Sequence, residues 1–309
     1  MVKRILTMVG LIALLAACGG GTTAPSTPNT APASGATVGS AAPLVPTTRA
    51  TPGTPSSTAF GLPPLPTGTV GATRAATPGT PVAATPVGTP RALPSASPVT
   101  FLPAPWQPGD RTLYSVTARD TGQIAGTASF TLGREFEAET LSAILAIGST
   151  QDRFVMGWTT ATFAPVSEIR SIVTAQGTID IRAEFHQGGG TIEVINSAGS
   201  TVNRLNLPPR YYANDQLLMI LRALPFKEGY QGALVLVPSQ GDPATLTAVV
   251  TVTGQETVTT PLGPVRAWRV EAQFENSPTI QILWYGVEAP NYLVKYDTGR
   301  YIYTVSQRP

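Results

Sequence analysis

The side chains that could carry acid–base or nucleophilic catalysis are few in this sequence. His186 is the only histidine among 309 residues, and it stands beside the turn Gly188-Gly-Gly190. A Ser-His-Asp mechanism would need this histidine as its base, yet no serine lies in a Gly-x-Ser-x-Gly context. We therefore interpret His186 as an exposed residue at a strand end, and we predict no catalytic residue.

A pair of carboxylates could hydrolyse a glycosidic bond without histidine. Glu135, Glu137 and Glu139 alternate with Phe136 and Ala138, which predicts three acids on one face of a strand. Because like charges repel unless they are solvated, we expect this face to point into water.

Glu256 leaves two interpretations open, because it lies among threonines in a predicted hairpin. It could be a buried acid that orients the turn, which we prefer, or a ligand contact.

Structural zinc needs four nitrogen or sulfur ligands, and this sequence offers one histidine and one cysteine. Calcium loops of the Asp-x-Asp-x-Asp-Gly type are also missing, so we predict neither a metal nor a cofactor.

Tyrosine side chains give a modest indication of ligand binding, because each combines an apolar ring with a polar tip. Most of them are expected to fill the edges of a β core. A few could instead line a concave sheet face beside an apolar helix and bind an acyl chain, another apolar ligand or a glycan. The candidate ligand-binding residues are Leu217, Leu221, Tyr285, Tyr292 and Tyr296.

Cys18 is the only cysteine, and it follows Leu15-Ala16-Ala17 at the end of a segment typical of an export signal. That segment starts with Lys3 and Arg4, and its apolar run from Ile5 to Leu15 is too short to span a bilayer. A single cysteine in an exported protein carries a free thiol unless the cysteine is modified. The alternative is an ordinary secretory signal in which the cysteine has no function.

The residues around Cys18 resemble the bacterial lipoprotein signal. This resemblance implies that residues 1–17 are a signal peptide that is removed, and that Cys18 is acylated, as with palmitate, and becomes the mature N-terminus. Two or three acyl chains hold a protein firmly on a membrane, whereas one chain holds it only marginally. We therefore expect a lipid-anchored protein on the extracytoplasmic face of the cell membrane or on the outer membrane.

Residues 18–100 are predicted to be a disordered linker that follows the lipidated cysteine. Residues 19–100 contain 16 of the 30 prolines, one aromatic residue (Phe60) and no acidic residue. So little apolar surface cannot offset the conformational entropy that folding would cost. The Thr/Pro tracts favour extended, solvated backbone, so we expect a spacer and a plausible O-glycosylation stalk.

Charge is divided between the two parts of the chain. The whole sequence has a formal net charge of +2, but 15 basic residues face all 18 acidic residues after residue 100. The basic pI therefore arises from the signal and the linker, and it does not predict nucleic-acid binding. The expected partners are the membrane, through the N-terminal lipid, and a lipid, a glycan or an envelope protein.

Residues 101–309 are predicted to form one mainly β domain, since they hold 21 of the 22 aromatic residues. Apolar and polar side chains alternate from Ile179 to Phe185 and from Trp268 to Phe274, as expected of half-buried antiparallel strands. Glycine-containing turns separate such segments at short intervals. The predicted strands cover 111–118, 125–132, 141–148, 154–160, 166–174, 177–185, 191–196, 200–205, 232–237, 244–253, 255–260, 265–275, 279–286, 292–297 and 300–305.

One segment breaks this pattern and predicts a helix at about 213–224. Asn214 and Asp215 are capping residues at its start, and Pro225 ends it. The segment is apolar on nearly every side, which predicts a buried or lidding helix. We therefore expect an antiparallel curved sheet, or half-barrel, with this helix on its concave face.

The β domain resembles the DUF3108 family of exported bacterial proteins over nearly all of 101–309. The resemblance rests on Pro108-Gly-Asp-Arg-Thr-Leu-Tyr114, the helix end Leu221-Arg-Ala-Leu-Pro-Phe226, the hairpin Val252 to Trp268 and the strand Ile282-Leu-Trp-Tyr285. These motifs are structural, so the resemblance implies fold and compartment rather than an activity. We expect a binding or scaffold module for apolar or envelope-derived material; the alternatives are a histidine-independent carbohydrate hydrolase and a purely structural envelope protein.

Overall fold

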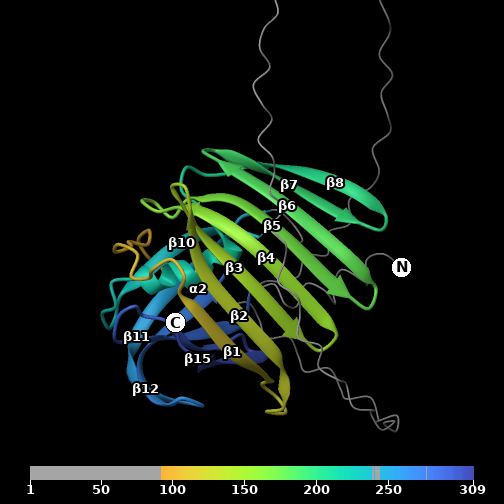
Figure 1. Ribbon diagram of the computed structural model, residues 1–309. Coiled ribbons are helices and arrows are strands. Elements are labelled where there is room, and N and C mark those ends of the chain that lie inside the picture. The colour runs from red at the N-terminus through yellow and green to blue at the C-terminus, as the bar shows by residue number, and fades with distance from the viewer. Residues whose placement is uncertain (1–91, 239, 241–243, 276) are drawn as a thin grey trace, which may run out of the picture. The chain divides into compact units, whose positions relative to one another are not determined.

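The computed structural model describes residues 92–238, 240, 244–275 and 277–309. The predicted signal peptide, Cys18 and most of the predicted linker lie outside these residues. The described residues form a 15-stranded sheet that curves around a short helical segment (Figure 1). The prediction of a mainly β, half-barrel fold is confirmed.

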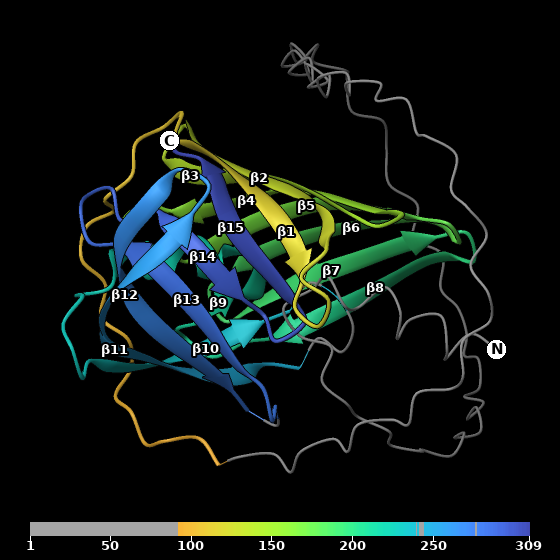
Figure 2. The same cartoon turned by 90° about the horizontal axis from the view of Figure 1, so that it is seen from below.

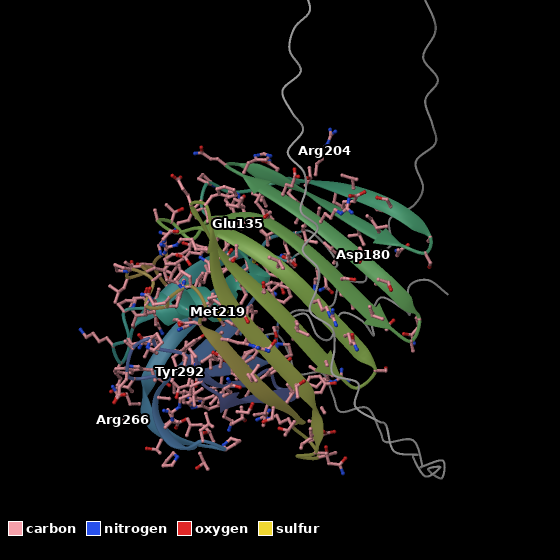
Figure 3. All side chains as sticks on the ribbon, viewed as in Figure 1. Glu135, Asp180, Arg204, Met219, Arg266 and Tyr292 are labelled. Carbon is pink, nitrogen blue, oxygen red and sulfur yellow. The ribbon has the colours of Figure 1, made fainter. Side chains whose placement is uncertain are left out.

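Alternation of apolar and polar side chains builds the strands of this sheet. In β6 (Gly177–His186), Ile181, Ala183 and Phe185 are buried, whereas Arg182 and Glu184 are exposed. One face of each such strand therefore packs inward while the other meets solvent. Figure 3 shows this contrast: Met219 lies within the curve of the sheet, and Asp180 and Arg204 lie on exposed strand positions.

The strands follow two antiparallel meanders that join where β1 pairs with β15. The sheet order is β8-β7-β6-β5-β4-β3-β2-β1-β15-β14-β13-β12-β11-β10-β9, and only β9 runs parallel to its neighbour β10. The bounds are β1 Arg111–Ala118, β2 Ile124–Glu135, β3 Ala138–Ile147, β4 Thr150–Thr159, β5 Pro165–Thr174, β7 Gly189–Asn196, β8 Gly199–Asn206, β9 Tyr212–Ala213, β10 Gln231–Val237, β11 Leu246–Thr260, β12 Gly263–Phe274, β13 Ile280–Gly286, β14 Leu293–Asp297 and β15 Tyr301–Gln307.

The helical segment comprises η1 (Asn214–Gln216), α2 (Leu217–Ile220) and η2 (Leu221–Ala223). It belongs to the connection from β8, at one end of the strand order, to β9 and β10 at the other. In Figures 1 and 2 this connection runs inside the curve of the sheet. Every residue of the helical segment is buried, which confirms the prediction of a buried helix.

The predicted capping by Asn214 and Asp215 is wrong. Ala213 occupies the N-cap position, and its backbone N–H donates to the Gln216 side chain at 3.3 Å. Asp215 is instead ion-paired with Arg170 of β5. Tertiary pairing has therefore replaced the local capping that the residue types suggested.

Residues 97–110, which we call the strap, run from β10 to β1. Val99 donates to Ala233 O at 2.9 Å and Ala233 donates to Ser97 O at 2.8 Å. Further on, Leu102 donates to Ala223 O at 2.7 Å, and Gly109 donates to Leu132 O at 2.7 Å. The strap thus joins β10, the helical segment and β2 through backbone hydrogen bonds.

Candidate functional site

A pocket of about 370 Å³ lies where the strap passes the C-terminal end of the helical segment. Four parts of the chain form it: the strap, residues 222–226, β12 and the β13–β14 connection. Apolar and aromatic side chains predominate. The lining residues are Leu102, Pro103, Pro105, Arg222, Ala223, Leu224, Phe226, Trp268, Val287 and Asn291.

An aromatic wall gives one side of the pocket its shape. The rings of Phe226 and Trp268 stack with a centroid distance of 6.1 Å and an interplanar angle of 10°. Behind them, Tyr285 packs on Phe226 with a centroid distance of 5.6 Å. Phe226 and Trp268 keep part of their surface accessible, whereas Tyr285 is fully buried. The wall therefore offers ring surface to a ligand from a fixed position.

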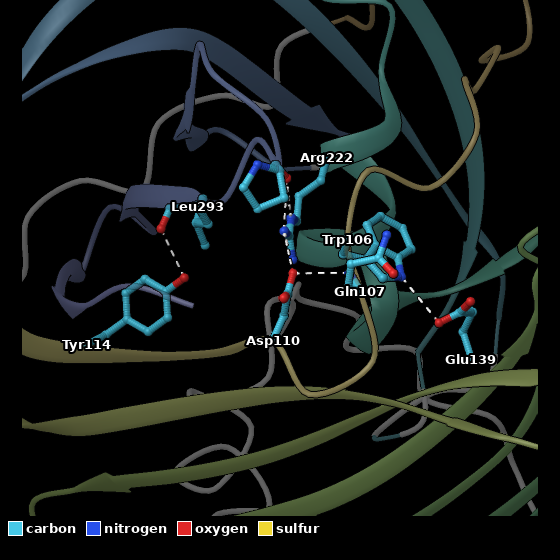
Figure 4. Close-up of polar contacts among 8 residues, drawn as sticks. Trp106, Gln107, Asp110, Tyr114, Glu139, Arg222 and Leu293 are labelled. Carbon is cyan, nitrogen blue, oxygen red and sulfur yellow. Dashed lines mark hydrogen bonds and ion pairs between the residues drawn. The ribbon is translucent and has the colours of Figure 1, made fainter.

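Arg222 is the only charged residue among those that line the pocket. Its side chain is 2% exposed, and Nε and Nη2 donate to Pro290 O at 3.2 Å and 2.9 Å. Nη2 also lies 3.5 Å from Asp110 Oδ2, and the guanidinium lies 5.4 Å from the ring centroid of Trp106 (Figure 4). Burial lowers the pKa of Arg222 below its usual value, since desolvation disfavours the charged form.

A second buried contact fixes the strap below the pocket. Trp106 Nε1 donates to Glu139 Oε2 at 3.3 Å (Figure 4). Arg134 Nη2 lies 2.5 Å from Glu139 Oε1. Glu139 is fully buried, while the Arg134 side chain is half exposed. The carboxylate therefore has a partner for each oxygen, and its arrangement is that of a structural acid.

A buried ionic cluster joins β4 and β5 to the helical segment. Arg170 pairs with Asp152, lies 3.0 Å from Asp215 Oδ1, and lies 3.6 Å from Glu168 Oε1. Its guanidinium also lies 5.1 Å from the ring centroid of Phe154. Burial raises the pKa of Asp152, and the charge of Arg170 opposes part of that rise. These carboxylates share one guanidinium, and none of the four residues lines the pocket.

The five predicted ligand-binding residues lie in the core rather than in the pocket lining. Leu217, Leu221 and Tyr285 are at most 1% exposed, and Tyr296 is 2% exposed. Tyr285 donates to Leu218 O at 3.0 Å, and Tyr296 donates to Gln281 Oε1 at 2.5 Å.

Tyr292 also belongs to the core cluster, and Arg308 lies 5.7 Å from its ring centroid. The concave face beneath the helix is therefore filled by these side chains. The pocket lies beyond the end of the helix. Its lining includes Arg222, which follows Leu221 in the chain, and Phe226, which packs on Tyr285.

The pocket residues that sequence reasoning missed include Arg222, Phe226 and Trp268. Arg222 lies in a segment of mostly apolar residues, so no local pattern indicated its role. Its partners Asp110 and Pro290 are 112 and 68 residues away in the sequence. Phe226 and Trp268 fell within motifs that looked only structural. A single arginine in an otherwise apolar buried helix is the signal that could have found this site, because buried charge needs a compensating group.

The expectation of three acids on one outward strand face is wrong. Glu135 ends β2, Phe136 and Glu137 form the turn, and Glu139 points inward from β3. Phe136 has a φ of 54°, so a hairpin turn replaces the strand that alternation predicted.

The other acid–base candidates have structural surroundings. Glu256 is exposed and accepts from Trp284 Nε1, so it is not the buried acid that we preferred. His186 is exposed at the end of β6, as expected, and its Nδ1 lies 3.3 Å from Gln187 O.

Two negative findings apply to the described parts of the chain. No group of three or more His, Cys, Asp or Glu side chains there is arranged to hold a metal ion. No helix there has the length and apolar character needed to cross a membrane.

Comparison with solved structures gives two distant similarities. A DUF1089 family protein from Pseudomonas aeruginosa aligns with a TM-score of 0.28 and 9% identity, over 59% of this chain and 89% of its own. A protein with YmcC-like fold from Bacteroides fragilis aligns with a TM-score of 0.27 and 14% identity, over 68% of this chain and 99% of its own. The curated proteins give no match.

The family comparison is more informative, because its match covers more than half of the chain. The model of the family described as "Protein of unknown function (DUF3108)" matches residues 113–300, which run from β1 to the turn before β15. The match includes Arg222, Phe226, Trp268 and Val287 of the pocket. This chain belongs to the DUF3108 family.

Proposed function

We propose that the β domain binds a small, largely apolar ligand in the pocket between the strap and the helical segment. We further propose that an acyl group on Cys18 tethers this binding module to the extracytoplasmic side of a membrane. The observation that carries the first proposal is the pocket itself, with its aromatic wall and its single buried cation. The sequence features of residues 1–100 support the second.

The dimensions and chemistry of the pocket support ligand binding. Small-molecule sites usually enclose about 300–1,000 Å³ and combine apolar walls with a few polar groups. This pocket has about 370 Å³, and its polar side chains come from Arg222 and Asn291. Arg222 and Asn291 are themselves held by hydrogen bonds to Pro290 O and Gly286 O, so the site is largely pre-formed.

The competing functions receive less support. A glycoside hydrolase requires two carboxylates that flank the scissile bond. The described residues that line the pocket include neither aspartate nor glutamate. A purely structural role is favoured by one observation, the filled core beneath α2, but it gives no account of the partly accessible aromatic wall.

Titration with the neutral apolar dye N-phenyl-1-naphthylamine tests the proposed binding function. The full-length chain should enhance the dye fluorescence with one site per chain. Val287→Trp should fill the pocket and weaken dye binding at least about ten-fold, whereas the matched variant Val202→Trp should leave it within about two-fold. Val202 lies on β8 and is 58% exposed, so its replacement introduces the same side chain away from the pocket.

Absence of dye binding to the wild-type chain would overturn the proposed function. Equal affinity in wild type and Val287→Trp would place the dye elsewhere and would also overturn it. Each variant should first show the wild-type thermal unfolding midpoint, so that lost binding reports the pocket rather than the fold.

A further inference from the structure

We propose that Arg222 makes the pocket selective for single-chain amphiphiles with an anionic head, such as alkyl carboxylates. This inference rests on the proposed function, because it assigns the ligand class of the same pocket. It predicts that the alkyl chain packs against Phe226 and Trp268 while the head group reaches the guanidinium.

Arg222 is incompletely paired. Its closest acceptor is the neutral carbonyl of Pro290 at 2.9 Å, and its only described ion-pair partner is Asp110 at 3.5 Å. Charge-assisted N–H to carboxylate bonds are usually about 2.7–2.9 Å long. The side chain of Asp110 is 17% exposed, compared with 2% for Arg222, so the carboxylate lies nearer to water than the charge it faces. A buried guanidinium with so distant a counterion favours a further anion.

One nitrogen of the Arg222 guanidinium has no hydrogen bond to the described residues. The hydrogen bonds of this guanidinium to described residues use Nε and Nη2, and none involves Nη1. Three described side-chain atoms are both buried from solvent and without a hydrogen-bond partner, and none of them belongs to Arg222. Nη1 is therefore not sealed inside the protein. Because Arg222 lines the pocket, Nη1 is the donor available to a ligand that enters it.

The surroundings of the guanidinium favour an anion over a neutral head group. The described lining residues include no acid, and the nearby phenols of Tyr114 and Tyr285 stay protonated because burial raises their pKa. In a site of low dielectric, an oxyanion gains more from the guanidinium than a hydroxyl does. The small volume of the pocket favours one chain over a lipid with two chains.

Displacement of N-phenyl-1-naphthylamine by decanoate and by 1-decanol tests this selectivity in the full-length chain. The two competitors share a chain length and differ in head-group charge. Decanoate should displace the dye from wild type at a concentration at least about ten-fold lower than 1-decanol. Arg222→Gln should reduce that ratio to about one, and Arg222→Lys should retain part of it because the cation remains.

Asp110→Asn should raise the affinity for decanoate, whereas Arg222→Gln should lower it. The amide still accepts the hydrogen bond from Gln107 N–H, which is 3.2 Å long in the wild type, but it no longer competes for the guanidinium. Decanoate affinity should rise about three-fold or more, while 1-decanol affinity should stay unchanged. This test stands even if Arg222→Gln does not fold.

The outcomes separate the two proposals. Dye binding with equal displacement by decanoate and 1-decanol in wild type would overturn the anionic selectivity and leave the pocket proposal intact. A fall in decanoate affinity in Asp110→Asn would also overturn the selectivity. Failure of wild type to bind the dye at all would overturn the proposed function and this inference with it.

Discussion

Arg170 on β5 and Asp215 in the first turn of the helical segment form a buried ion pair, with Nη1 and Oδ1 3.0 Å apart. The pair links the concave face of the sheet to the segment that leads to the pocket. Asp152 and Glu168 share the same guanidinium, so a single cation faces three buried carboxylates. The helical segment, and with it Arg222, is held in place by this cluster.

Replacement of Arg170 by Met should therefore destabilise the fold strongly. Removal of one partner from a buried ion pair typically costs about 3–5 kcal/mol, because the remaining charges are left uncompensated. Arg182→Met is the matched control, since Arg182 lies on the exposed face of neighbouring β6. Urea unfolding of both variants measures the difference; a cost for Arg170→Met within about 1 kcal/mol of the control would contradict this account.

Two strand glycines should differ sharply in their tolerance of alanine. A Cβ on Gly126 of β2 would lie 1.8 Å from Ala146 O, whereas a Cβ on Gly157 of β4 would approach no closer than 3.6 Å to Ser167 Oγ. Overpacking against backbone cannot be relieved by a rotamer change, so Gly126→Ala should cost about 3 kcal/mol or more and Gly157→Ala less than about 1 kcal/mol. Similar unfolding midpoints for the two variants would show that β2 and β3 are less closely paired than described.

Buried tyrosines should make the fold sensitive to alkaline pH. Burial raises the pKa of Tyr285, Tyr296 and Tyr303 above the usual value of 10.0. Above that pH the unfolded chain loses phenolic protons that the folded chain keeps, so fewer protons are bound in the unfolded state and stability falls as pH rises. Each such tyrosine contributes about 1.4 kcal/mol per pH unit until its folded pKa is reached.

Tyr303→Phe tests this linkage with Tyr301→Phe as its partly exposed control. Between about pH 9 and about pH 11, the free energy of unfolding should fall less for Tyr303→Phe than for wild type, because one titrating phenol has been removed. Urea unfolding at both pH values gives the comparison. An identical pH dependence in wild type and Tyr303→Phe would exclude Tyr303 as a linked group.

Local patterns in the sequence predicted most strands but not the continuity between them. The alternation from Ile179 to Phe185 placed β6 well, because one face of that strand is buried. Strands predicted at 244–253 and 255–260 are a single strand, β11. Gly254, with a φ of 143°, sits at a bulge within it rather than at a turn.

The parts that sequence reasoning missed depend on contacts between distant residues. β9 has two residues, Tyr212 and Ala213, which is too short for any periodicity. The pocket likewise depends on the strap, which contacts Ala223 through Leu102 and Glu139 through Trp106. Neither contact leaves a pattern in the local sequence. The sequence therefore led us to predict a ligand site beneath the helix, whereas the pocket lies beyond the end of the helix.

A crystal structure of the full-length chain with 10-bromodecanoate would test the central claim most directly. The account predicts an anomalous bromine peak in the pocket bounded by Leu102, Phe226 and Trp268, with the carboxylate in hydrogen-bonding reach of Arg222 Nη1. An empty pocket, with bromine peaks found only at other surfaces or not at all, would contradict it.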